Sequence, residues 1–192
     1  MSSIIISGGP GSGKTTLLEA LKKKGFHCSD EISRQLIQEQ VALNSECLPW
    51  KNLSSFADLA LERMLEAYEK ASFSAKITFF DRAIPDIIGY LNVGGLPVDK
   101  KFHRILKSHP YHQHVFMAPP WEAIYINDDE RWQTFDEATT LHNALVQTYL
   151  AAGYKIIQLP FSSVAERVGF VLEKLEQFSL PAHEHQNYLP KS

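Results

Sequence analysis

The sequence predicts an α/β domain in which a parallel five-stranded sheet carries helices on both faces. Three observations predict it: five short apolar runs, segments of helical apolar spacing between them, and a glycine-rich junction after the first run. The length of 192 residues suits one domain, and 44 % hydrophobic with 21 % charged residues is typical of a folded globular chain. We expect the domain to cover residues 1–178.

The first predicted strand ends in a glycine-rich turn that leads directly into a helix. Residues 3–7 form an isoleucine-rich run, and residues 14–24 place leucines on one helical face before Gly25 ends the helix. Between them stands the pattern Gly-x-x-x-x-Gly-Lys-Thr in the strand–loop–helix context of a phosphate-binding P-loop. The residues expected to bind the nucleotide are Gly8, Gly9, Pro10, Gly11, Ser12, Gly13, Lys14, Thr15 and Thr16.

Each part of this loop has a physical role in binding a triphosphate. Glycines let the backbone fold closely around an anion, and the following helix adds the positive end of its dipole. Lys14 is expected to reach the β- and γ-phosphates, and the Thr15 hydroxyl to hold Mg²⁺. Because the chain lacks the Asn-Lys-x-Asp motif of guanine readers, ATP is the favoured nucleotide.

The next two strands end in charged residues. A short strand over 26–29 ends in Asp30-Glu31 and precedes a helix over 32–41 and a loop over 42–52. Ser54 or Ser55 is expected to cap a long helix that runs to residue 71. The apolar run 77–80 is typical of a strand buried in a parallel sheet, and it ends in Asp81-Arg82.

The second half of the chain continues the alternation of helices and strands. Capping boxes formed by Thr134 with Glu137 and by Ser163 with Glu166 mark the starts of two helices. Residues 119–134 are expected to form a small lid, and residues 179–192 a loosely held tail. The predicted helices cover 85–93, 100–107, 135–152 and 163–178, and the predicted strands cover 115–117 and 155–159.

Charged residues that follow the strands are candidates for phosphoryl-transfer chemistry. In a parallel sheet, ligands bind beyond the carboxyl ends of the strands, so these residues are expected to meet near the P-loop. Asp81 has the Walker B position and is expected to bind Mg²⁺. Arg82 is expected to stabilise the transferring phosphoryl group, and Glu31 to accept a proton from an attacking hydroxyl.

Three further residues have two interpretations each. Arg34 lies one helical turn after Glu31 and either orients Glu31 or binds an anion, unless the two form only a surface ion pair. Arg131 neutralises the phosphoryl group if its segment closes as a lid, and otherwise lies in a solvated loop. Trp121 stacks on a flat ligand or packs against the domain.

Several of these motifs together resemble a known family. The P-loop, Glu31-Ile32-Ser33-Arg34 and Phe80-Asp81-Arg82-Ala83-Ile84-Pro85-Asp86 are similar to the AAA-type P-loop ATPases and kinases linked to NAD metabolism, which include nicotinamide riboside kinase domains. The resemblance implies a kinase-like sheet in which the Asp81 strand lies next to the P-loop strand. It also implies an acidic pocket near Glu31 and Asp86 that suits a cationic nicotinamide. Deoxynucleoside kinases are similar in the acid after the second strand and in the acid–Arg pair after the third.

Two functions follow from these residues. The first is a small-molecule kinase that uses ATP and Mg²⁺ to phosphorylate a hydroxyl of a nucleoside- or riboside-like substrate, with Glu31, Arg34, Asp86 and Trp121 binding that substrate. The alternative is a nucleotide-dependent switch or binding module with slow hydrolysis and a protein or lipid partner.

Composition restricts the other function classes. The net charge of −3 gives no indication of a general nucleic-acid partner, and no apolar run approaches the roughly 18 residues of a membrane span. The first strand begins by Ser3, so we expect no signal peptide, and the two cysteines suit reduced thiols. These features lead us to expect a cytoplasmic protein without a membrane span.

Overall fold

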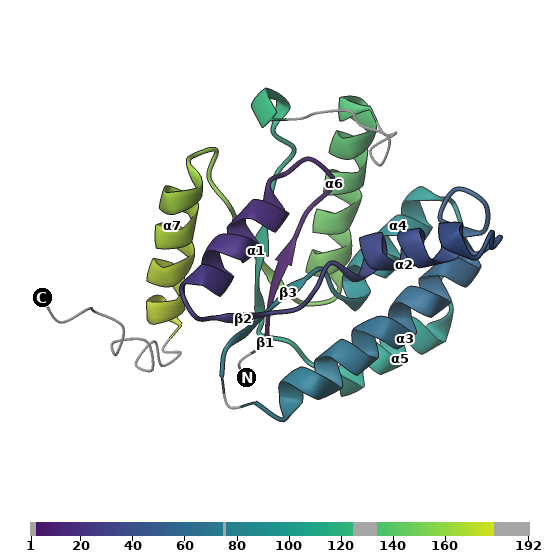
Figure 1. The fold of residues 1–192 in the computed structure, drawn as a ribbon, viewed down its shortest axis with the longest axis horizontal. Helices are drawn as coiled ribbons and strands as arrows, with labels where there is room; N and C mark the ends of the chain where they lie inside the picture. The colour runs from purple at the N-terminus through teal and green to yellow at the C-terminus, as the bar shows by residue number, and fades with distance from the viewer. Residues whose placement is uncertain (1–2, 75, 125–133, 179–192) are drawn as a thin grey trace, which may run out of the picture.

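The computed structural model describes residues 3–74, 76–124 and 134–178 (Figure 1). The strands are β1 (Ser3–Ser7), β2 (His27–Cys28), β3 (Thr78–Asp81), β4 (His114–Met117) and β5 (Lys155–Gln158). The helices are α1 (Lys14–Lys23), α2 (Ile32–Ala42), α3 (Leu53–Ser72), α4 (Ile84–Val93), α5 (Lys100–Ser108), α6 (Phe135–Ala151) and α7 (Val164–Gln177), with a short 3-10 helix η1 (Glu122–Ile124).

The strands form one parallel sheet in the order β2-β3-β1-β4-β5. The predicted five-stranded parallel sheet is therefore confirmed, as is the position of the Asp81 strand beside the P-loop strand, where Ile6 pairs with Asp81. The strand order reverses at β1, because the chain moves to one side of β1 for β2 and β3 and to the other for β4 and β5. Such a reversal opens a crevice at the carboxyl ends of the strands, which is where ligands bind in this class of fold.

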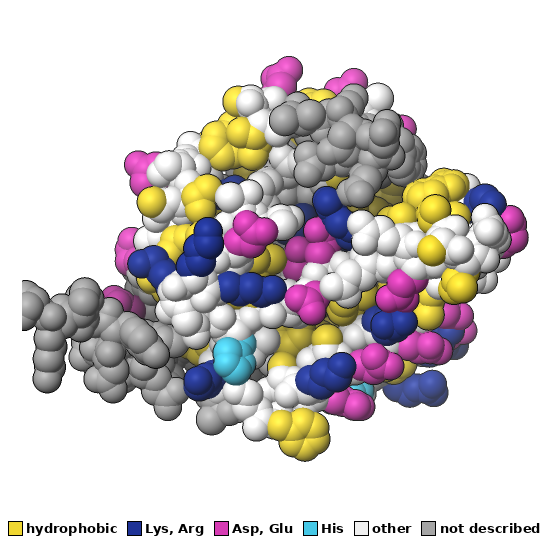
Figure 2. All heavy atoms as spheres, in the orientation of Figure 1, with side chains coloured by type: hydrophobic (Ala, Val, Ile, Leu, Met, Phe, Trp, Pro, Cys, Tyr) yellow, Lys and Arg dark blue, Asp and Glu magenta, His cyan; other side chains and the backbone are white. Residues whose placement is uncertain are grey.

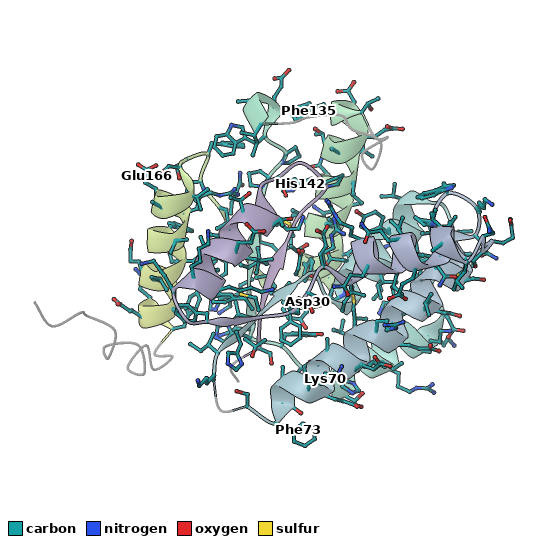
Figure 3. The ribbon with its side chains drawn as sticks, viewed as in Figure 1. Asp30, Lys70, Phe73, Phe135, His142 and Glu166 are labelled. Carbon is teal, nitrogen blue, oxygen red and sulfur yellow. The ribbon has the colours of Figure 1, made fainter. Side chains whose placement is uncertain are left out.

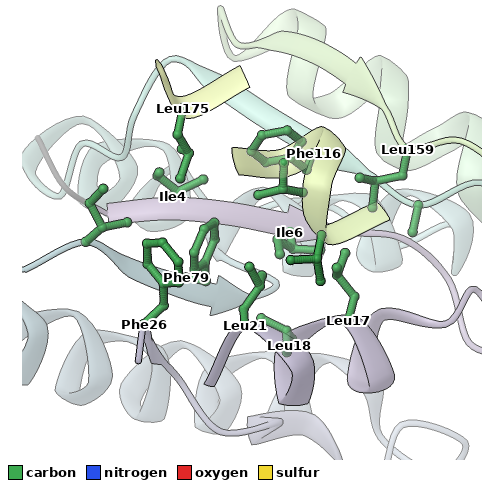
Figure 4. Packing of buried hydrophobic residues seen from close by; sticks show 14 residues of the cluster. Ile4, Ile6, Leu17, Leu18, Leu21, Phe26, Phe79, Phe116, Leu159 and Leu175 are labelled. Carbon is green, nitrogen blue, oxygen red and sulfur yellow. The ribbon is translucent and has the colours of Figure 1, made fainter. Parts of the chain in front are cut away.

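Alternation along β1 divides the core between the two faces of the sheet. Ile4 and Ile6 pack with residues of α1 and α7, as Figure 4 shows, whereas Ile5 packs on the opposite face with residues of α6. All three side chains are buried, as expected of a central strand covered on both faces.

A second apolar cluster lies among α2, α3, α4 and α5. It includes Leu36, Phe56, Met64, Ile88 and Phe102, all buried. Helices α3 and α4 also contact each other, and α4 packs against α6. This cluster holds α2 and α3 beside the sheet, so that they form the walls of the cavity described below.

The start of α3 differs from the prediction. The N-cap is Asn52, whose side-chain oxygen accepts a hydrogen bond from the Ser55 N–H at 3.1 Å, so Ser54 and Ser55 lie in the first helical turn. Asparagine caps a helix as well as serine does, and sequence alone did not separate these neighbours. The capping boxes at Thr134 and Ser163 are confirmed.

Parts of the predicted lid and tail lie outside the described residues. Arg131 belongs to residues 125–133, and the predicted tail comprises residues 179–192. Within the described ranges, no helix has both the length and the apolar character needed to cross a membrane.

Candidate active site

The P-loop occupies the turn between β1 and α1. Gly8, Gly11 and Gly13 have φ angles of 144°, 70° and 76°, a conformation that side chains disfavour. A Cβ atom at Gly8 would lie 2.4 Å from the Ala118 carbonyl oxygen, so the end of β4 leaves no room for a side chain there. Backbone angles and close approach therefore both require glycine at Gly8.

Lys14 is folded back over this loop. Its Nζ donates a hydrogen bond to the Gly9 carbonyl oxygen at 3.0 Å, and the Ser12 hydroxyl donates to the same oxygen at 2.8 Å. Burial, assisted by the positive charge of Arg82, lowers the pKa of Lys14 to about 8. The site thus holds a buried amine that lacks a full counter-charge, as expected of a group that receives an anion.

Asp81 lies at the carboxyl end of β3 and is only 4 % exposed. The Asp81 N–H donates to the Ser29 hydroxyl oxygen at 2.9 Å, whereas the carboxylate Oδ1 has no hydrogen-bond partner among the described residues. Burial raises the pKa of Asp81, and the positive charges of Lys14 and Arg82 oppose this rise.

These residues fit a magnesium ion that binds together with a nucleotide. A buried carboxylate oxygen without a partner costs free energy unless a cation or donor satisfies it. Mg²⁺ commonly uses one or two carboxylates, a hydroxyl and the substrate phosphates, and Asp81 with Thr15 at the start of α1 offers such a set.

Arg82 follows β3 in an unusual backbone conformation. Its φ angle is 67°, and its N–H donates to the Ile6 carbonyl oxygen at 3.1 Å. The guanidinium carbon lies 5.7 Å from the centre of the Tyr90 ring, and Nε is buried without a hydrogen-bond partner among the described residues. A left-handed non-glycine residue costs about 1–3 kcal/mol and tends to occur at functional sites.

Glu31 precedes α2 and meets the P-loop helix. Its Oε2 atom lies 3.5 Å from the Thr15 hydroxyl, which is at the limit of a hydrogen bond, and 3.3 Å from Arg34 Nε. The predicted Glu31–Arg34 ion pair is therefore present, and it stands at the edge of the nucleotide site. Glu31, Lys14 and Arg82 line one cavity, and the charges of Glu31, Asp81 and Arg82 all affect the pKa of Lys14. The structure therefore brings these four residues together.

Asp86 is tied into the fold behind the site. It is 1 % exposed, and its carboxylate accepts hydrogen bonds from the Ser7 hydroxyl at 2.5 Å, the Ala83 N–H at 2.8 Å and the Tyr149 hydroxyl. It borders the cavity, and its predicted role in substrate binding stays a prediction.

Trp121 lies on the α7 side of the P-loop. Its ring is 5.6 Å from the Phe161 ring, and the guanidinium carbon of Arg167 lies 5.8 Å from its centre. Figure 3 labels Glu166 in the first turn of α7, the helix that carries Arg167, and Phe135 at the start of α6. Trp121 thus contacts residues at and just before α7. Glu31 and Arg34, by contrast, stand at the start of α2.

Arg167 is a site residue that the sequence reasoning did not select. It is 3 % exposed, and its guanidinium donates to the Ser12 carbonyl oxygen at 3.1 Å, which ties α7 to the P-loop. A Cβ atom at Gly13 would lie 2.8 Å from the same guanidinium. The sequence pattern that could have identified Arg167 is its position as a charged residue one helical turn before Val171, on the apolar face of α7.

One cavity of about 1210 Å³ is lined by most of these groups: the P-loop, Glu31, Arg34, Arg82, Asp86, Trp121 and Arg167, but not Asp81. It begins at the P-loop and Trp121, passes Glu31 and Arg82, and continues between α2, α3 and α4. Its volume exceeds the roughly 300–1,000 Å³ of common single-ligand sites, which leaves room for two ligands. The fold, the P-loop and this cavity define the protein as a P-loop nucleotide-binding protein with a kinase-like fold.

Comparison with known proteins agrees with that class. The model of an AAA domain family matches residues 3–167, so the chain belongs to this family. The family resemblance predicted from the motifs is thereby confirmed. Nucleotide-binding proteins from two strains of Actinobacillus pleuropneumoniae are 34 % identical over 88 residues. The match covers 42 % of this chain and about 30 % of the length of these curated relatives.

Solved structures show the same fold. A deoxyadenosine kinase from M. mycoides with bound dCMP and dCDP has a TM-score of 0.65 at 14 % identity, covering 92 % of this chain and 100 % of that one. Thymidylate kinase from Candida albicans has a TM-score of 0.66 at 16 % identity, covering 93 % and 92 %. The NadR protein in complex with NR has a TM-score of 0.67 at 18 % identity, covering 92 % of this chain and 52 % of that one.

Proposed function

We propose that this protein is an ATP-dependent kinase that phosphorylates a hydroxyl group of a nucleoside- or riboside-like molecule. The observation that carries the proposal is the continuous cavity, which leads from the P-loop past Glu31 into a second space between α2, α3 and α4. A protein that only binds or hydrolyses a nucleotide needs no such second space. The deoxyadenosine kinase and thymidylate kinase structures, which share the fold, support the proposal of a kinase.

The nucleotide half of the site holds ATP on the P-loop. When ATP binds, the Lys14 ammonium group gives up its hydrogen bond to the Gly9 carbonyl oxygen and donates to the triphosphate instead. The triphosphate supplies the negative charge that the buried ammonium group lacks in the free protein. Thr15 and Asp81 would hold Mg²⁺, which neutralises charge on the phosphate oxygens when it is bound. The buried Arg167 keeps the loop in place from the α7 side.

In the acceptor half of the cavity, the reacting hydroxyl would lie at Glu31. The acceptor oxygen forms a bond to the γ-phosphorus while the bond to the β,γ-bridging oxygen breaks and ADP leaves; the hydroxyl proton goes to the Glu31 carboxylate. Arg34, 3.3 Å away, orients that carboxylate, and Arg82 stabilises the transferring group, as Arg131 would if its segment closes as a lid. Asp86 borders the cavity as a candidate substrate-binding residue, whereas Trp121 lines its P-loop end, so a contact of Trp121 with the acceptor stays a prediction.

Replacing Glu31 with glutamine tests this role. Glu31→Gln keeps the shape of the side chain but removes the proton acceptor, so phosphoryl transfer should fall about 10²–10⁴-fold while the Kd for ATP changes little. The assay measures ADP release with a panel of nucleosides and ribosides, and ATP binding by calorimetry.

The matched control is Glu39→Gln in α2, the helix that follows Glu31. Glu39 forms an ion pair with Arg63 at 2.9 Å and does not line the cavity, so this variant should retain full transfer activity. Unchanged transfer in Glu31→Gln would remove Glu31 from the mechanism. If no acceptor raises turnover above the basal rate, the nucleotide-dependent switch becomes the better reading.

A further inference from the structure

The acceptor half of the cavity has two unlike ends. Charged side chains stand at the P-loop end, where Glu31, Arg34 and Arg82 line the cavity. The wall contributed by α3 carries no polar side chain among the residues that line the cavity. It consists of Leu53, Phe56, Ala57, Ala60 and Met64.

The charged side chains nearest to this wall, within the described part of the chain, offer no free negative charge to a cation. The Glu31 carboxylate pairs with Arg34, the Asp86 carboxylate accepts three hydrogen bonds, and Arg82 is itself a cation that lies over the Tyr90 ring. A positively charged ring placed against α3 would therefore lose its water without gaining a new counter-charge from these residues. Burying an unpaired ion costs several kcal/mol or more, whereas burying an apolar ring is favourable.

The apolar surface continues to the mouth of the cavity. Val41, Trp50 and Val93 line the cavity and remain 52 %, 49 % and 47 % exposed. In Figure 2, hydrophobic side chains gather over the α2 end of the molecule. Neighbouring exposed apolar side chains at a cavity mouth indicate a surface that a ligand covers, and a tryptophan ring suits a flat ligand.

We propose that the acceptor is a molecule whose non-reacting part is an uncharged apolar or flat ring, and that the site selects it over ribosides whose ring carries a permanent positive charge. This inference rests on the proposed kinase function. It narrows the acceptor class and departs from the acidic pocket for a cationic nicotinamide that the family resemblance implies. The apolar α3 wall, in the same cavity as Glu31, is the feature that decides it.

A neutral acceptor and its cationic counterpart test the proposal. With the P-loop saturated by a non-hydrolysable ATP analogue and Mg²⁺, binding is measured for dihydronicotinamide riboside and nicotinamide riboside, whose rings differ in charge, and for the neutral nucleosides adenosine and thymidine. Dihydronicotinamide riboside should bind at least about 100-fold more tightly than nicotinamide riboside. Equal or tighter binding of nicotinamide riboside, or binding by none of the neutral molecules, overturns the proposal.

A pair of variants locates the binding surface. Val41→Asp puts a carboxylate at the mouth of the cavity and should weaken binding of the neutral acceptor about 5–10-fold, with ATP affinity unchanged. Leu43→Asp adds the same charge two residues away, at a position that is 72 % exposed and outside the cavity, and should change neither affinity. Equal effects of the two variants would contradict an acceptor at this wall.

Binding and transfer are measured separately so that the two proposals can fail separately. If neutral acceptors bind but no phosphorylated product forms, the kinase function fails and the selectivity of the groove stands. If cationic ribosides are phosphorylated faster than their neutral partners, the kinase function stands and the inference about the acceptor fails.

Discussion

Lys14 illustrates, at the scale of a single residue, how the fold prepares a site for an anion. Lys14 is 6 % exposed, and its ammonium group donates to the Gly9 carbonyl oxygen at 3.0 Å. Loss of water and the nearby charge of Arg82 lower its pKa from 10.5 to about 8, although Asp81, Glu31 and Asp86 act in the opposite direction. A bound triphosphate adds negative charge beside the amine, so it should raise this pKa again.

This shift predicts that nucleotide affinity depends on pH. Above pH 8 the free protein has largely lost the Lys14 proton and must take one up to bind the triphosphate, so affinity should fall about tenfold per pH unit until the pKa of the complex is reached. The Kd for ATP between pH 7 and 10, and proton uptake by calorimetry in two buffers, check this. Lys14→Arg stays charged throughout and should give a flat profile; an equal slope in that variant would assign the effect to another group.

Lys14 also affects stability without nucleotide, and the sign follows from the same shift. Because its folded pKa is lower than its unfolded pKa, the unfolded chain binds more protons between about pH 8 and pH 10.5. The contribution of Lys14 to the free energy of unfolding therefore rises with pH in this window. Below it, keeping the buried ammonium charged opposes folding.

At the scale of elements, Asp86 joins three of them behind the active site. Its carboxylate accepts from Ser7 at the end of β1, from the Ala83 N–H at the start of α4 and from Tyr149 in α6. The turn between β3 and α4 is thereby fixed, and this turn carries Arg82 in its left-handed conformation. Asp86 thus helps to determine where Asp81 and Arg82 stand, and this role explains its burial.

Removing one hydrogen bond from this network should destabilise the protein measurably. Tyr149→Phe leaves a buried carboxylate with one donor fewer, which should cost about 1–3 kcal/mol and lower Tm by several degrees. Thermal unfolding checks the value. Tyr68→Phe is the control, since Tyr68 donates to the Pro110 carbonyl from a part-buried position and its loss should cost less. A smaller effect at Tyr149 than at Tyr68 would show that the network does not hold the elements together.

At the scale of the whole molecule, local patterns in the sequence predicted most of the fold. The five apolar runs and the Gly-x-x-x-x-Gly-Lys-Thr pattern identified the parallel sheet and the P-loop, because periodicity and glycine requirements are local properties. The position of β3 beside β1 was implied by the family resemblance and is confirmed by the sheet order.

The rest of the site depends on contacts between distant parts of the chain. Arg167 contacts Ser12 across 155 residues, and only the docking of α7 beside α1 reveals that contact. The apolar acceptor wall likewise depends on how α2, α3 and α4 pack, which no spacing along the chain encodes. Asp86 was predicted as a substrate-binding residue, but its burial and its partners Ser7 and Tyr149 depend on contacts that the sequence pattern does not encode.

The most direct test of kinase activity follows the γ-phosphate. The protein is incubated with γ-³²P-labelled ATP, Mg²⁺ and the neutral nucleosides and ribosides, and the labelled products are separated. The cavity that joins the P-loop to the acceptor groove predicts label in a phosphorylated nucleoside or riboside, with this product reduced about 10²–10⁴-fold in Glu31→Gln. Label found only in inorganic phosphate, at a rate that no acceptor changes, would contradict a kinase.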